Sequence, residues 1–136
     1  MLHLVFNALV QPLFDYCKVV CGTCGKTLCD KLQKLQNQMA LMMTCFCYDV
    51  NPDNLFDQFG LTNLQTQQVI AKAVMVYKSL HGLTPEYVIS KFVYRDLPYS
   101  IRDSTNKLYL PLLRTNYLKN SFRYSGLALW NRLPLT

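Results

Sequence analysis

Apolar side chains recur three or four positions apart along most of the chain, which is the spacing of amphipathic helices. In residues 2–20 this pattern is interrupted at Pro12, so we expect that helix to kink or divide in two. Thr27 suits the N-cap of a longer second helix, with Asp30 in its first turn. One stripe of this helix is predicted to pack into a core and consists of Leu28, Leu32, Leu35, Met39, Met42 and Phe46.

Turn signals divide the middle of the chain into further helices. The Asn-Pro-Asp sequence at 51–53 predicts the start of a short helix. Thr62 and Gln65 have the spacing of a capping box, so the next helix is predicted to begin there and to end at Gly82. The Thr-Pro-Glu sequence at 84–86 predicts another short helix, to about residue 92.

The periodicity changes between residues 93 and 113. The segments 100–103 and 107–113 are rich in Leu, Tyr and Ile and flank a turn, which predicts a hairpin or an extended excursion around residues 99–113. Helical spacing returns over residues 116–133. The predicted fold class is therefore mainly α, a small helical bundle with one short extended element. Its two segments, 1–92 and 93–136, are expected to pack as one unit.

Charge is unevenly placed along this pattern. Residues 1–90 hold six basic and six acidic side chains, whereas residues 91–136 hold eight basic and two acidic ones, a net charge of +6. A segregated basic segment indicates a polyanionic partner, most commonly nucleic acid; a solvated basic face without a partner is the alternative. The candidate nucleic-acid-binding residues are Arg102, Lys107, Arg114, Lys119, Arg123 and Arg132.

Two features of this basic segment bear on how it would bind. Lys119 and Arg123 are four positions apart on the predicted last helix, so they are expected to share a face. Aromatic residues alternate with the basic ones, which suits base stacking beside phosphate contacts. Core or rim packing is the alternative for the tyrosines, and core packing is expected for the Phe and Trp. These aromatic residues are Tyr99, Tyr109, Tyr117, Phe122, Tyr124 and Trp130.

The cysteines are the other candidate chemistry. Cys21 and Cys24 have the spacing of zinc ligands, but no second pair follows at a usual spacing and both histidines are isolated. We expect the six cysteines to act as small buried apolar side chains, with a zinc site and a redox pair as the alternatives. No catalytic motif is present, so no catalytic residue, metal or cofactor is expected. Asp15, inside an apolar run, is expected to make a structural hydrogen bond.

Composition narrows the class of protein. The 136 residues are 51% hydrophobic and only 16% charged, which predicts one domain with a real core and a surface that packs against something larger. The most apolar run, residues 2–14, includes polar residues and is shorter than a membrane span, and no basic region precedes it. We expect an intracellular location with reduced thiols and no membrane partner.

Five strings resemble one family and occur in that family's order. They are LVQPLFDYCKVV at 9–20, GKTLCDKLQKLQN at 25–37, VYKSLHGLTPEYV at 76–88, SIRDS at 100–104 and RTNYLKNSFRYSGLALWNRLP at 114–134. Together they resemble the C-terminal part of reverse transcriptases encoded by non-LTR (LINE-type) retrotransposons. The chain departs from the family at Cys21, where Trp is usual, and at Gln38 and Leu41, where basic residues are favoured. It matches the family's tail at Arg102, Arg114, Asn116, Lys119, Ser121, Phe122, Trp130 and Asn131.

The resemblance implies a helical thumb and the segment that follows it. In the family this region grips the template–primer duplex through its backbone and lies beside the polymerase palm. The aromatic-x-Asp-Asp box of the palm has no counterpart here, so the resemblance implies a catalytically incomplete fragment rather than an enzyme. We expect weak, sequence-independent binding to an RNA or DNA backbone and no small-molecule substrate. The alternative is a helical protein–protein interaction module without nucleic-acid binding.

Overall fold

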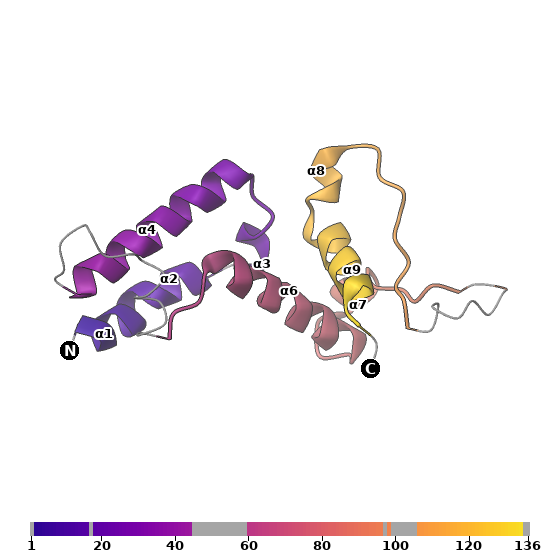
Figure 1. Cartoon of the computed structure of the whole chain (residues 1–136). Helices are drawn as coiled ribbons and strands as arrows, with labels where there is room; N and C mark the ends of the chain where they lie inside the picture. The colour runs from indigo at the N-terminus through magenta and orange to yellow at the C-terminus, as the bar shows by residue number, and fades with distance from the viewer. Residues whose placement is uncertain (1, 17, 45–59, 97, 99–105, 135–136) are drawn as a thin grey trace. The chain divides into compact units, whose positions relative to one another are not determined.

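The computed structural model describes residues 2–16, 18–44, 60–96, 98 and 106–134 (Figure 1). This part of the chain is mainly helical, which confirms the predicted fold class. The predicted short helix after residue 51, Phe46 of the apolar stripe and the first arm of the excursion lie outside the described residues. None of the helices described is both long enough and apolar enough to cross a bilayer.

Packing divides the chain into an N-terminal unit, Met1–Val69, and a C-terminal unit, Ile70–Thr136. Helix α6 (Leu64–Leu80) contributes to both. The division at 92/93, predicted where the apolar periodicity changes, stays a prediction.

The first predicted helix changes to a π-helical turn just before Pro12, but it stays helical through Pro12 and is interrupted at Tyr16. It consists of α1 (Leu2–Val5), a π-helical turn η1 (Phe6–Val10), α2 (Gln11–Asp15) and α3 (Lys18–Cys21). Because Pro12 has no amide hydrogen, the α-helical ladder cannot continue through it, and the Gln11 amide bonds instead to the Phe6 carbonyl. Tyr16 then adopts an extended conformation and ends α2.

Helix α4 (Lys26–Thr44) begins before the predicted cap. The amides of Leu28 and Cys29 both bond to the Gly25 carbonyl, so Thr27 lies inside the helix and the prediction of a Thr27 cap was wrong. The predicted core stripe was also largely wrong. Leu32 and Met39 are half-buried, whereas Leu28, Leu35 and Met42 are exposed.

Polar side chains explain why α4 turns a different face inward. Gln36 and Ala40 are its fully buried residues. The side-chain Oε1 of Gln33 accepts a hydrogen bond from the backbone amide of Leu64 at 3.0 Å, and the side-chain Nε2 of Gln36 donates to the backbone carbonyl of Thr62 at 3.4 Å. Helix α4 therefore satisfies backbone groups at the start of α6, where unpaired buried groups would be costly.

Of the predictions for the two ends of α6, the capping residues at its start were wrong and the stop at its end was right. At its start, the Asn63 side chain accepts from the Gln65 amide at 3.0 Å, so Asn63 is the cap and the predicted pairing of Thr62 with Gln65 was wrong. At its end, Gly82 has φ +71° and the Leu83 amide reaches the Lys78 carbonyl at 2.9 Å. This left-handed turn confirms the predicted stop at Gly82.

The C-terminal unit is built around one apolar cluster. Four buried residues come from α6, from the turn after α7 (Glu86–Ile89), from the extended segment and from α9 (Phe122–Arg132): Val76, Phe92, Leu108 and Leu127. Phe122 and Trp130 pack against this cluster, which confirms their predicted place in the core. Gly126 is buried in α9, and a Cβ there would lie 3.0 Å from Cγ2 of Val76. The helices approach closely at that point.

The described part of the extended excursion pairs with an earlier segment. Tyr94 and Leu108 form an antiparallel bridge, flanked by hydrogen bonds from the Arg95 amide to the Lys107 carbonyl and from the Tyr109 amide to the Val93 carbonyl, both at 2.9 Å. We call residues 93–95 and 107–109 the ribbon. Asn106, with φ +69°, lies in a turn directly before the second arm of the ribbon, whereas residues 104 and 105 of the predicted turn lie outside the described residues.

Candidate nucleic-acid interface

The predicted last helix is two helices. Helix α8 (Asn116–Lys119) is capped by Thr115, whose hydroxyl accepts from the Leu118 amide at 3.4 Å. Ser121 then has ψ 150°, and its hydroxyl donates to the Leu118 carbonyl at 2.6 Å. Because this extended residue separates α8 from α9, Lys119 and Arg123 do not share a face of one helix, and that prediction was wrong.

Helix α9 separates two of the candidate residues. Arg123 and Arg132 lie near its opposite ends, nine residues apart. At about 1.5 Å and 100° per residue, nine residues correspond to about 14 Å along the axis and a half-turn offset around it. The two guanidinium groups therefore start from opposite sides of α9, and no row of basic residues runs along this helix.

The ribbon gathers a basic group that sequence spacing does not reveal. Arg95 lies opposite Lys107, on the face away from buried Leu108. Asn131 of α9 is bonded to the second arm of the ribbon. Its side chain accepts a hydrogen bond from the Leu108 backbone amide at 2.8 Å and donates one to the Leu108 backbone carbonyl at 3.0 Å. Arg132, the next residue, is thereby brought to the same end of α9 as the ribbon. Arg95 was not among the candidate residues, and only the long-range pairing identifies it.

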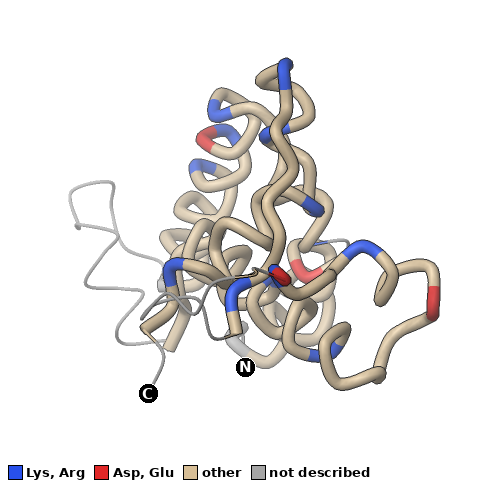
Figure 2. Tube along the Cα trace, turned by 90° about the vertical axis from the view of Figure 1, so that its right-hand side faces the viewer, with Lys and Arg blue, Asp and Glu red and all other residues tan. Residues whose placement is uncertain are grey.

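The candidate basic side chains are largely accessible. Arg114, Lys119, Arg123 and Arg132 are exposed and Lys107 is half-buried, whereas Arg102 lies outside the described residues. Figure 2 marks the basic positions in blue along the trace. Within the part of the chain that the structure describes, none of the four exposed residues is held in an ion pair. Their charges are therefore available to an anionic partner.

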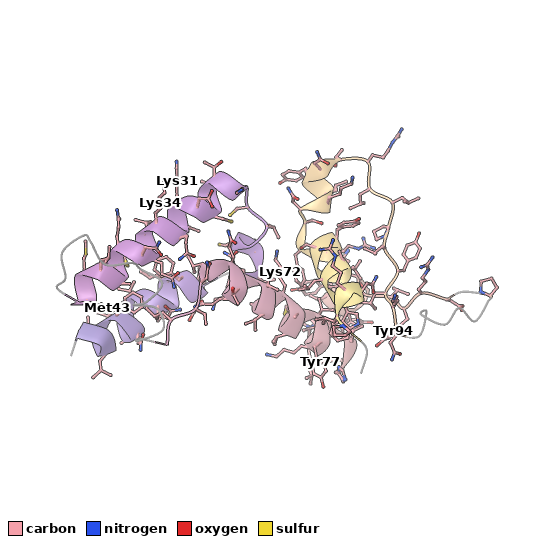
Figure 3. The ribbon with its side chains drawn as sticks, in the orientation of Figure 1. Lys31, Lys34, Met43, Lys72, Tyr77 and Tyr94 are labelled. Atoms are coloured by element: carbon pink, nitrogen blue, oxygen red, sulfur yellow. The ribbon has the colours of Figure 1, made fainter. Side chains whose placement is uncertain are left out.

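Aromatic side chains accompany this basic surface. Tyr117 is 88% exposed, and Tyr94 and Tyr109 on the ribbon are also exposed. On α6, Tyr77 (labelled in Figure 3) stacks on His81 with ring centroids 4.0 Å apart, and its ring centroid lies 6.5 Å from that of Trp130. Neither Tyr77 nor His81 was a candidate, because both lie outside the basic segment 91–136. Exposed rings of this kind offer faces on which bases can stack.

The other residues considered for chemistry are Asp15 and the cysteines. Asp15 accepts a hydrogen bond from the Gln11 side chain at 3.2 Å and pairs with Lys18 at 2.6 Å, which confirms its structural role. Among the described residues, no three Cys, His, Asp or Glu side chains lie together as a metal ion would require. Cys21 is exposed and Cys24 half-buried, so Cys21 departs from the expectation of buried cysteines.

Comparison with known proteins adds no relative. A scan against protein-family models, a search of curated proteins and a search of solved structures each give no match. The function is therefore inferred from the chemistry that the geometry allows. Exposed cations on several elements suit contact with a charged backbone more than readout of base edges by one helix.

Proposed function

We propose that this chain is the thumb-like region of a non-LTR retrotransposon reverse transcriptase, and that it binds nucleic acid weakly and without sequence preference. The five strings at 9–20, 25–37, 76–88, 100–104 and 114–134 support the family, and a mainly helical fold suits a thumb. The 136 residues contain no aromatic-x-Asp-Asp box, so we assign them no polymerase chemistry of their own. The palm of such a polymerase is a second proposed partner.

One observation carries the nucleic-acid part of the proposal. The charge excess of +6 lies in residues 91–136, and Arg114, Lys119, Arg123 and Arg132 expose their side chains there without an ion pair among the described residues. A solvated basic face usually intersperses acidic side chains, whereas this segment contains only Asp96 and Asp103. A phosphate backbone supplies the missing negative charge.

The arrangement favours backbone contact over sequence recognition. Reading base edges requires several side chains from one element in a groove. Here the basic residues come from the ribbon, from both ends of α9 and from α8, and α9 directs Arg123 and Arg132 from opposite sides. We therefore expect the affinity for unrelated sequences to be similar.

The test is a binding titration with the full chain. Fluorescence anisotropy would follow a labelled RNA–DNA hybrid and a second hybrid of unrelated sequence at several salt concentrations. The variant Lys119→Glu with Arg123→Glu removes two proposed contacts. Its matched control is Lys31→Glu with Lys34→Glu on α4, which makes the same charge change on two exposed residues of the N-terminal unit (Figure 3).

The proposal requires that the first variant weaken binding more than the control, and that both hybrids bind alike. Each lost phosphate contact reduces the slope of log K against log salt by about 0.9, so the first variant should lower the slope by about 2. Equal effects of the two variants would show that only net charge matters. Binding insensitive to both salt and these charges would exclude the proposed contact.

A second candidate is a helical protein–protein interaction module. It is favoured by the exposed apolar stripe of α4, where Leu28, Leu35 and Met42 recur every seven residues and are 55%, 46% and 74% exposed. An apolar row at that spacing is typical of a helix that packs along a partner. A compact monomer in size-exclusion chromatography, without binding of an apolar dye, would count against this candidate.

A further inference from the structure

Two cysteines of the N-terminal unit face each other across the start of α4. The sulfur atoms of Cys24 and Cys29 lie 3.3 Å apart, and the Cys29 sulfur is 3.8 Å from the Cys24 carbonyl oxygen. Neither residue is in a disulfide, and both are half-buried rather than sealed from solvent. The pair therefore combines close approach with access for a small reagent.

Backbone hydrogen bonds hold both residues at this distance. The Cys24 amide bonds to the Cys21 carbonyl at 3.1 Å in the turn after α3, and the Cys29 amide bonds to the Gly25 carbonyl at 3.2 Å in the first turn of α4. The two sulfurs are thus placed by secondary structure on either side of Gly25. Groups held in this way react with a high effective concentration.

The structure brings Cys24 close to Cys29, whereas the Cys-x-x-Cys spacing suggests a pair between Cys21 and Cys24. Cys21 and Cys24 have the Cys-x-x-Cys spacing, but no sulfur contact joins them within the described residues, and Cys21 is exposed on its own. Since a disulfide bond requires sulfurs at about 2.05 Å and Cβ atoms about 3.8 Å apart, proximity decides which pair closes. The contact at 3.3 Å is already between Cys24 and Cys29.

We infer that Cys24 and Cys29 are a thiol pair that a low-molecular-weight disulfide such as glutathione disulfide converts to an intramolecular disulfide. The thiolate of one cysteine attacks a sulfur of glutathione disulfide and expels one glutathione thiolate. The second cysteine thiolate then attacks the protein sulfur of the mixed disulfide and expels the other. In sum, two protein thiols and one glutathione disulfide become one protein disulfide and two glutathione thiols.

Closing this bond would fix the start of α4 to the preceding turn. The loop so formed spans only residues 24–29 and includes Gly25, the residue whose carbonyl begins the helix. The site thus takes a disulfide-exchange reagent as its substrate class, independently of any binding by the basic surface.

The experiment is native oxidation of the full chain followed by disulfide mapping. Reduced protein would be treated with glutathione disulfide, quenched by alkylation and digested with trypsin. Cleavage after Lys18, Lys26 and Lys31 places Cys24 in peptide 19–26 and Cys29 in peptide 27–31, so their bond joins two peptides that reduction separates. A bond between Cys21 and Cys24 would stay within the first peptide.

Three single variants and a denatured sample make the result specific. Wild type and Cys21→Ser should give the joined peptides. Cys24→Ser and Cys29→Ser should lose them and retain a glutathione adduct on the other cysteine of the pair. In concentrated urea the preference for this pair should disappear, because the fold creates it. Absence of the joined peptides in Cys21→Ser, equal yields with and without urea, or mainly intermolecular disulfides would overturn the inference.

Discussion

At the scale of single residues, Asn131 has the most defined role in the C-terminal unit. Its amide group bonds to both the amide and the carbonyl of Leu108, at 2.8 and 3.0 Å, and so fixes the ribbon to α9. Leu108 itself is 1% exposed in the apolar cluster. One side chain therefore satisfies two backbone groups of Leu108 at the edge of the apolar cluster.

We predict that Asn131→Ala destabilises the protein by about 1–3 kcal/mol, because it leaves the Leu108 amide and carbonyl without partners. Urea unfolding followed by circular dichroism would measure the change. Asn116→Ala is the control: Asn116 is exposed at the start of α8, although it matches the same family pattern. If the two variants lost equal stability, the assigned role of Asn131 would be wrong.

Gly82 provides a second test at this scale. It ends α6 with φ +71°, and no atom lies within 4 Å of where its Cβ would be, so conformation alone opposes substitution. Gly82→Ala should cost about 1–2 kcal/mol. Gly82→Asn should cost less in the same unfolding measurement, since Asn tolerates left-handed backbone. Equal losses for Ala and Asn would contradict the conformational explanation.

At the scale of elements, local signals were reliable where the cause was a backbone property. Pro12 lacks an amide hydrogen, so a π-helical turn precedes it, and Gly82 stops α6 because it tolerates a positive φ. The break at Ser121 was missed because the apolar spacing of residues 116–133 continues across it. The inward face of α4 was missed because Gln33 and Gln36 are drawn inward by backbone groups 26 to 31 residues away.

The contact between α6 and α9 leads to a prediction about Gly126. Alanine is the better helix former by about 1 kcal/mol, so propensity alone predicts stabilisation. Its Cβ, however, would lie 3.0 Å from Cγ2 of Val76, which is fully buried and stiff because it is β-branched. We expect Gly126→Ala to lower stability by about 1–3 kcal/mol, measured by urea unfolding.

A double-mutant cycle supplies the control for this prediction. Val76→Ala removes the atom that the new methyl group would meet, so Gly126→Ala should cost less in that background than in wild type. The difference is the coupling energy of the contact. A cost that is unchanged by Val76→Ala would place the strain elsewhere.

At the scale of the whole molecule, the sequence located the charge but not its arrangement. The excess in residues 91–136 is a property of composition, and the exposure of Arg114, Lys119, Arg123 and Arg132 agrees with it. The pairing of Arg95 with Lys107 and the attachment of the ribbon to α9 through Asn131 depend on contacts between residues 12 to 23 positions apart. Spacing along one chain does not encode such contacts.

Salt separates the two candidate functions, because charge contacts and apolar contacts respond to it in opposite ways. With four phosphate contacts, nucleic-acid affinity should fall about 10²-fold between 50 and 200 mM salt. Apolar association through α4 should persist or strengthen in sulfate. Leu28→Gln with Met42→Gln should reduce self-association in light scattering and leave anisotropy unchanged, since both residues are exposed in the N-terminal unit. Self-association that resists salt and is lost in this variant would instead favour the interaction module.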